Sequence, residues 1–173
     1  MTQTVTTRRA AVADAGSLAE LGARTFSETF AADNKPADMA AYLAASFGTA
    51  KQKAELADPQ STFFVAEVGA VMIGYVRMQA GDFPACVTGS KPIELARIYV
   101  AQEWLGRSVG EALMRACINE ARQTGHGAMW LGVWERNERA QAFYHKWGFR
   151  VVGRQTFQLG ADLQNDFVME RAL

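Results

Sequence analysis

Apolar and polar residues recur along this chain with two periods, one typical of strands and one typical of helices. Residues 5–12 alternate as a strand does, and Asp14 can cap the helix that follows. The Asp58–Pro59 pair indicates the end of a helix, because the residue before a proline disfavours helical dihedral angles. The first third of the chain is therefore expected to hold a strand at 5–12 and helices at 14–30, 38–47 and 49–57.

The middle of the chain has the composition of β structure. Two β-rich runs flank Val68-Gly69-Ala70, which predicts a tight hairpin within residues 61–80. Residues 81–92 are rich in turn-forming residues and predict a loop. Another strand is predicted at 93–100.

Helices and strands alternate in the last third of the chain. Apolar residues at helical spacing predict an amphipathic helix over 108–124, and Gly125 and Gly127 end it. The remaining elements are expected to be a strand at 128–134, a helix at 137–147 and two closing strands at 149–157 and 165–173. This order predicts an α+β fold with a βαβ unit, in a single domain over residues 1–173.

Composition and charge narrow the class of protein. The 173 residues are 49% hydrophobic and 21% charged, with 18 basic and 18 acidic side chains, which is ordinary for a globular protein. No basic surplus favours a nucleic-acid partner. The N-terminus lacks an apolar core of signal-peptide length, and no run approaches about eighteen apolar residues, so we expect a cytoplasmic protein without a membrane partner. Cys86 and Cys117 are too few and too far apart for a disulfide framework or a zinc site, and no metal is expected.

The stretch WLGRSVGEAL, residues 104–113, places two glycines where a helix must begin. A helix start exposes unpaired backbone N–H groups, and glycine lets an anion come close to them. The stretch lacks both the Lys-Ser/Thr ending of a nucleoside-triphosphate loop and the G-x-G-x-x-G pattern. Gly106 and Gly110 alone fit a plain loop as well as a phosphate site, and Arg107 favours the phosphate site.

Three segments together resemble the GCN5-related N-acetyltransferase (GNAT) superfamily, and within it the small bacterial polyamine acetyltransferases of the PaiA type. The segments are LARIYVAQEWLGRSVGEALM, WLGVWERNERAQAFYHKWGFRVVG and the early TFSETF. The resemblance covers nearly the whole chain. It implies the GNAT fold, a mixed and mostly antiparallel sheet flanked by helices, which splays between its fourth and fifth strands and binds acetyl-CoA in the gap.

The resemblance also implies which residues contact the cosubstrate. Backbone N–H groups from Leu105 to Gly110 would bind the pyrophosphate, with Arg107 adding charge, and the strand at 98–100 would pair with the pantetheine arm. Ser108 stands where the family usually has a second glycine, so its side chain either crowds the phosphate or donates a hydrogen bond to it. The expected contacts are Ile98, Tyr99, Val100, Leu105, Gly106, Arg107, Ser108, Val109, Gly110, Glu111, Asn137, Ala140 and Tyr144.

Acetyl transfer to an amine requires that an ammonium of pKa about 10 lose a proton and that the departing thiolate receive one. Tyr144 matches the family tyrosine that protonates the thiolate, although its helical spacing from Ala140 and Trp147 also fits core packing. Glu94 matches a carboxylate base on the fourth strand, and an exposed carboxylate at a strand edge is the alternative. Asn137 either caps its helix or contacts coenzyme A, or does both.

The resemblance places the acceptor near the early segment. Phe26, Glu28 and Phe30 belong to the part that usually walls the acceptor pocket, and Arg97 either orients Glu94 or a substrate or has a structural role. The expected function is acetyl transfer from acetyl-CoA to a small primary amine, with spermidine or spermine first, by direct attack. The alternatives are an amino acid, an antibiotic or a protein N-terminus as acceptor, or a non-catalytic acetyl-CoA-binding module. A homodimer is a further expectation from the family.

Overall fold

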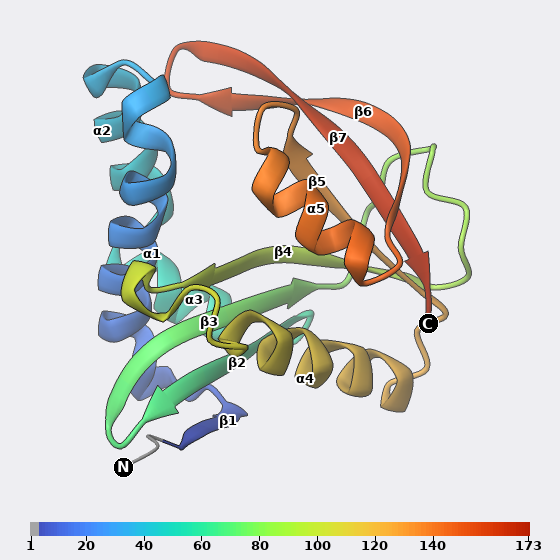
Figure 1. Ribbon diagram of the computed structural model, residues 1–173, viewed down its shortest axis with the longest axis horizontal. Coiled ribbons are helices and arrows are strands. Elements are labelled where there is room, and N and C mark those ends of the chain that lie inside the picture. The colour runs from blue at the N-terminus through green and yellow to red at the C-terminus, as the bar shows by residue number, and fades with distance from the viewer. Residues whose placement is uncertain (1–3) are drawn as a thin grey trace.

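The computed structural model describes residues 4–173, in which seven strands form one mixed sheet in the order β1-β2-β3-β4-β5-β7-β6 (Figure 1). The strands are β1 (Val5–Arg9), β2 (Ser61–Val68), β3 (Val71–Gln79), β4 (Pro92–Val100), β5 (Ala128–Trp134), β6 (Arg150–Leu159) and β7 (Asp162–Ala172). The helices are α1 (Ala15–Phe30), α2 (Pro36–Ser46), α3 (Thr49–Ala57), α4 (Val109–Gln123) and α5 (Glu138–Lys146). The α+β class and the mixed sheet predicted from the sequence are confirmed.

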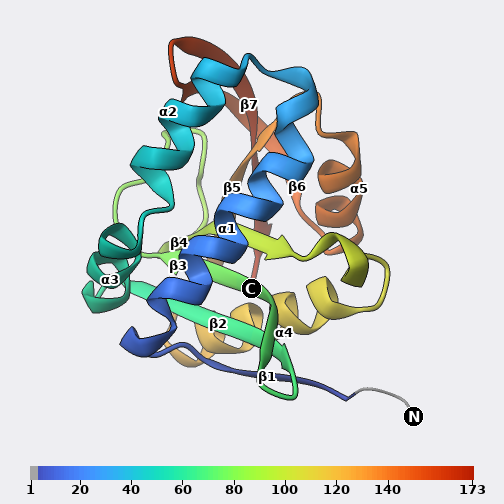
Figure 2. The same cartoon turned by 90° about the vertical axis from the view of Figure 1, so that its left-hand side faces the viewer.

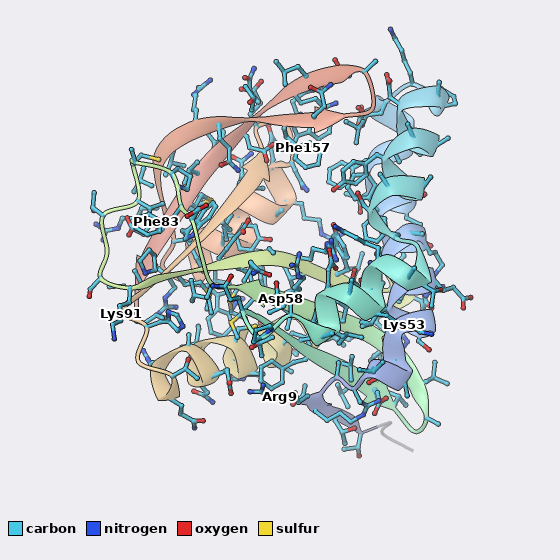
Figure 3. The ribbon with its side chains drawn as sticks, turned by 180° about the vertical axis from the view of Figure 1, so that it is seen from behind. Arg9, Lys53, Asp58, Phe83, Lys91 and Phe157 are labelled. Carbon is cyan, nitrogen blue, oxygen red and sulfur yellow. The ribbon has the colours of Figure 1, made fainter. Side chains whose placement is uncertain are left out.

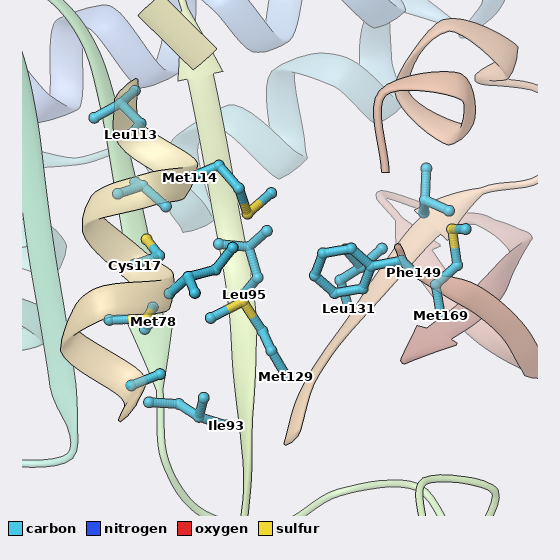
Figure 4. Close-up of a cluster of buried hydrophobic side chains, with 14 of the residues drawn as sticks. Met78, Ile93, Leu95, Leu113, Met114, Cys117, Met129, Leu131, Phe149 and Met169 are labelled. Carbon is cyan, nitrogen blue, oxygen red and sulfur yellow. The ribbon is translucent and has the colours of Figure 1, made fainter. Parts of the chain in front are cut away.

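Two apolar clusters hold helices against opposite faces of the sheet. On one face, Leu18 and Leu21 of α1 pack against Phe63, Val65 and Tyr75 of the β2–β3 hairpin, and Figure 2 shows α1 crossing in front of these strands. On the other face, the apolar stripe of α4 packs against β2, β3 and β4. Figure 4 shows this second cluster, which continues across to side chains of β5 and β7. The helices therefore fix both halves of the sheet.

The sheet opens between β4 and β5. These parallel strands pair only over three residues, Pro92–Glu94 against Ala128–Trp130, and then separate toward α1 (Figure 1). Within β4, Arg97 pairs with Arg77 while Leu95 pairs with Met78, so Ala96 is an extra residue. Such a bulge bends a strand and increases its twist. The bend lies just beyond the last β4–β5 pair, where the strands part.

The first strand is shorter than predicted. It ends at Arg9 rather than residue 12, and a short 3-10 turn over Val12–Asp14 leads into α1. Asp14 stands at the N-cap position of α1 as predicted, but its side chain makes no capping hydrogen bond, because its carboxylate accepts one of 2.7 Å from the Ala11 N–H and two from the Arg8 guanidinium. An ion pair of this kind competes with helix capping for the same oxygens.

Two other boundaries differ from the prediction. The helix predicted at 38–47 begins at Pro36, since proline has the backbone angle and the missing N–H that suit a first helical position. The closing hairpin is longer than the predicted strands, with β6 reaching Leu159 and β7 starting at Asp162. Gly160, at φ +58°, supplies the left-handed turn between them.

The core on the α4 face should carry much of the stability. Leu113 is fully buried there, and its replacement with alanine should lower the free energy of unfolding by about 2–5 kcal/mol, because a cavity remains. Urea unfolding measures the change. The matched control is Leu163→Ala, at a side chain 61% exposed on β7, with an expected change within about 0.5 kcal/mol. Equal effects of the two variants would contradict this view of the core.

Candidate functional site

A cavity of about 760 Å³ lies where β4 and β5 separate. Its walls come from α1, α2, β4, the turn before α4, β5, α5 and the β6–β7 hairpin. This volume lies within the range of small-molecule sites, about 300–1,000 Å³. The opening of the sheet thus creates a pocket that segments from most of the chain surround.

Most of the site residues expected from the sequence line this cavity. Those predicted to contact the cosubstrate are Ile98, Tyr99, Val100, Leu105, Gly106, Ser108, Val109, Gly110, Glu111, Asn137, Ala140 and Tyr144. Those predicted to face the acceptor are Phe26, Glu28, Phe30 and Arg97. Arg107 and Glu94 are not among the lining residues.

The turn before α4 is open to an anion. Gly106 has φ +74°, and a Cβ added there would meet no atom within 4 Å. Ser108 also has a left-handed conformation, at φ +61°, and no side chain caps the first N–H groups of α4. Unpaired N–H groups at the positive end of a helix bind phosphate well. The open space and the uncapped amides therefore fit a diphosphate.

Cationic side chains near the turn have partners of their own. The exposed guanidinium of Arg107 lies 5.4 Å above the ring of Trp104, outside the cavity lining. On α5, Lys146 lines the cavity and its Nζ lies 3.6 Å from an oxygen of Glu111. Backbone amides are therefore the groups that this turn offers to an anion, and charge from Arg107 stays a prediction.

Tyr144 both packs against core residues and lines the cavity, which are the two alternatives that its sequence pattern left open. Its ring packs with Phe143 and Phe149, at centroid distances of 5.6 and 5.8 Å, and the same residue lines the cavity. Burial raises the pKa of its phenol, which therefore stays protonated at neutral pH. A protonated phenol at a cavity wall can donate a hydrogen bond or a proton.

Asn137 caps α5. Its Oδ1 accepts a 3.2 Å hydrogen bond from the Ala140 N–H. Asn137 also lines the cavity, so its capping role is compatible with a contact to coenzyme A. That contact stays a prediction.

Glu94 lies at the closed end of the split rather than in the cavity. It belongs to the last residue pair that joins β4 to β5, opposite Trp130. Burial raises the pKa of its carboxyl, and the charges of Arg77 and Arg97 oppose that rise. The sequence placed Glu94 on the correct strand, but only the register shows that the strands are still paired at this point. Direct contact between Glu94 and a bound amine is therefore not supported.

Arg97 belongs to a buried ion cluster. Its guanidinium donates two hydrogen bonds, of 2.7 and 2.9 Å, to the carboxylate of Glu55 on α3. Arg77 on β3 approaches the same carboxylate at 3.4 Å. Arg97 thus ties α3 to β4 just beyond the bulge, and its expected binding of a substrate stays a prediction.

Aromatic side chains form the cavity wall between α1, α2 and the β6–β7 hairpin. Phe26 stacks on Tyr42 at 4.6 Å, Phe30 meets Trp134 at 5.7 Å, and Tyr42 meets Phe157 at 5.3 Å. Figure 3 shows Phe157 on this hairpin, at the opposite end of the molecule from Arg9. Sequence reasoning found Phe26 and Phe30 but missed Tyr42 and Phe157, which α2 and β6 bring to the same wall.

Sequence reasoning also missed Asp166. Its side chain is buried, at 7% exposure, and it lines the cavity from β7. Burial, assisted by the charge of Glu135, raises the pKa of Asp166 to about 6. An acidic residue two positions before the apolar Val168, on the same face of a strand, is the signal that could have found it.

Among residues 4–173, no three His, Cys, Asp or Glu side chains are placed to hold a metal ion. No helix within that range is long and apolar enough to cross a membrane.

Comparisons with known proteins place this cavity in context. Residues 20–149 match the model of the acetyltransferase (GNAT) family. The chain is 34% identical over 149 residues to an uncharacterized N-acetyltransferase of Lactobacillus delbrueckii, covering 86% of each chain. It is also 34% identical over 160 residues to one of Mycobacterium tuberculosis, covering 92% of this chain and 98% of the relative.

A solved structure shares the fold. It is the PaiA N-acetyltransferase of Thermoplasma acidophilum in complex with coenzyme A, with a TM-score of 0.79 and 20% identity. The alignment covers 98% of this chain and 99% of that one.

The left-handed Ser108 predicts a stability effect. A side chain in this conformation costs about 1–2 kcal/mol, so Ser108→Gly should raise the free energy of unfolding by about 0.5–1 kcal/mol. Ser108→Ala keeps the Cβ and should give no such gain. Urea unfolding of both variants measures the difference, and a gain in the alanine variant would show that strain at φ +61° is not the cause.

Proposed function

This chain belongs to the GNAT family of acetyltransferases, and we propose that it acetylates a small primary amine, with polyamines such as spermidine first. The enzyme is an N-acetyltransferase that uses acetyl-CoA. The observation that carries the proposal is a cavity with uncapped helix amides at one part of its wall and a buried carboxylate with aromatic rings at another. Such a cavity suits an anionic donor and a cationic acceptor.

Backbone groups provide the binding surface for the donor. The turn at 105–110 would hold the diphosphate, and β4 beyond Glu94 has no neighbour on its β5 side. Main-chain groups of Ile98, Tyr99 and Val100 on that side are available to pair with an extended arm. When bound, acetyl-CoA supplies an acetyl group activated as a thioester.

The reaction is a direct transfer that needs a neutral amine. The ammonium first gives up one proton, and the amine nitrogen then forms a bond to the thioester carbonyl carbon. The carbon–sulfur bond breaks, and the thiolate takes a proton from the Tyr144 hydroxyl. The nitrogen loses its second proton to solvent, and Tyr144 regains one. The products are an N-acetylated amine, a thiol and one released proton.

The two carboxylates near the split differ in position. Glu94 does not line the cavity, so its predicted role as base would act through intervening water. Asp166 lines the cavity directly and has no role as base in this mechanism. The proposed transfer uses no covalent enzyme intermediate, because neither Cys86 nor Cys117 lines the cavity and burial raises the pKa of the Cys117 thiol.

Several wider expectations stay predictions. They are a cytoplasmic location, the lack of nucleic-acid and membrane partners, and a homodimer. The Thermoplasma protein is a PaiA N-acetyltransferase, and this supports the polyamine class for the present chain only through the shared fold.

The test of the function is thiol release from acetyl-CoA with a panel of acceptors. Polyamines and diamines should give the highest kcat/KM, because their cations suit the carboxylate-containing cavity. Amino acids should be poorer, since their own carboxylate is repelled. Preference for amino acids, aminoglycoside antibiotics or peptide N-termini would contradict the proposed acceptor. Coenzyme A binding without turnover on any amine would instead favour a non-catalytic module.

Tyr144→Phe tests the proton donor. The variant keeps the ring packing and removes the hydroxyl, so kcat should fall about 100-fold or more while the amine KM changes little. The matched control is Tyr75→Phe, which removes a buried hydroxyl outside the cavity that has no hydrogen-bond partner among the described residues. The control should keep full activity. A Tyr144→Phe enzyme with unchanged kcat across the pH range would remove Tyr144 from the chemistry.

A further inference from the structure

We propose that Asp166 binds an ammonium group of the acceptor and so selects cationic amines. The proposal rests on the function proposed above and names the residue that recognises the acceptor.

Asp166 is held in the middle of the open half of the sheet. It pairs with Trp134 of β5 on one side and with Gln155 of β6 on the other. Residues opposite one another in antiparallel strands point to the same face, so these three side chains share a face of the sheet. This face carries Phe157 and Gln164 as well, both of which line the cavity.

Gly132 leaves room beside the carboxylate. A Cβ at this position would clash with the amide of Gln155 and lie 3.2 Å from Oδ2 of Asp166. The absence of a side chain on β5 at this point keeps the Gln155 and Asp166 side chains close together beneath the cavity. Three neighbouring strands therefore build the site around one carboxylate.

The Asp166 carboxylate is unpaired within the part of the chain that the structure describes. Among residues 4–173, no donor hydrogen-bonds to Asp166 and no Lys, Arg or His nitrogen lies within 4.0 Å of it. Glu135, which follows β5, is a second negative charge that raises its pKa. Arg154 of β6 forms an ion pair with Glu135 at 3.4 Å. The negative charge of Asp166 contributes to raising the pKa of the Tyr42 phenol on α2. A buried carboxylate in this setting is stabilised either by taking up a proton or by a cation that approaches from the cavity.

Aromatic rings around the same cavity favour an alkylammonium. Trp134 and Phe157 flank Asp166 on β5 and β6, and Phe30 and Tyr42 close the wall from the helices. Aromatic faces attract cations, and they also pack against the methylene groups between the nitrogens of a polyamine. Carboxylates and phosphates gain nothing from such a wall. The combination of a buried carboxylate and aromatic rings favours an aliphatic ammonium as the ligand.

Kinetics of Asp166→Asn provide the first test. The KM for spermidine should rise about 10- to 100-fold, the loss expected for a charge-assisted hydrogen bond, and the KM for acetyl-CoA should stay within about twofold. Asp82→Asn removes an exposed carboxylate from the loop between β3 and β4 and should change neither value. In the wild type the amine KM should also rise as pH falls below about 6, because Asp166 becomes protonated there.

Direct binding gives a readout independent of turnover. Calorimetric titration of spermidine into protein saturated with coenzyme A should show binding to the wild type, and binding at least about 10-fold weaker to Asp166→Asn. Asp166→Ala should behave like the asparagine variant.

The direction in which Asp166→Asn changes thermal stability distinguishes this inference from a purely structural role. Because the pKa is raised to about 6 in the folded state, the ionised carboxylate destabilises the fold increasingly as the pH rises from about 4, and fully above about 6. Asp166→Asn should therefore raise the Tm at pH 7.5. This gain should shrink as the pH falls through 6 toward 4, where the wild-type carboxyl takes up a proton.

The outcomes separate this inference from the proposed function. If the wild type acetylates amines and Asp166→Asn leaves the amine KM within about twofold, the inference fails and the function stands. A fall in kcat at constant KM would also overturn it, since Asp166 would then act as a base rather than as an anchor. If no amine is acetylated but spermidine binding depends on Asp166, the function fails and the inference stands.

Discussion

The early loss of pairing between two parallel strands is the constraint on which the rest of this structure depends. β4 and β5 pair over three residues and then part, although β4 stays paired with β3 and β5 with β7 over their lengths. Backbone polar groups on the facing edges beyond Glu94 and Trp130 consequently lack strand partners. Such groups require water or a ligand. The fold itself thus leaves the edge of β4 open and able to pair with a ligand.

Packing on both faces keeps the split open. The α4 cluster reaches from β2 across to β7, while α1 and α3 cover the opposite face of β2–β4. The ion cluster of Glu55, Arg77 and Arg97 fixes α3 to β4 beside the bulge. Closing the gap would require moving these packed elements together. A cavity of this kind is preorganised, and placement of two reactants in it makes acetyl transfer effectively intramolecular.

Much of the fold could be predicted because periodicity and turn residues act locally. Gly125 ends α4 in a left-handed conformation, as the sequence indicated, and the glycine turn before α4 lies at the cavity. Asp14 was not predictable from local spacing alone, because Arg8 donates hydrogen bonds to the carboxylate that would otherwise cap the helix. Its partner choice depends on three-dimensional geometry rather than on spacing.

Part of the site was predictable because sequence motifs, like periodicity, are local features of the chain. Tyr144 and the strand at 98–100 follow from motifs, whereas Tyr42, Phe157 and Asp166 reach the cavity through strand register and helix placement. Glu94 is the opposite case. It lies on the expected strand, but the register places it where β4 and β5 are still paired, outside the split. Single-residue register decides which side chains face a cleft, and the sequence does not encode it locally.

A crystal structure of the complex with coenzyme A tests the central claim most directly. The account predicts the diphosphate at the main-chain amides of residues 105–111 and the pantetheine arm paired with residues 98–100. The thiol sulfur should lie between β4 and β5, near Tyr144. Coenzyme A bound outside this split, or β4 and β5 paired along their full lengths in the complex, would contradict the account.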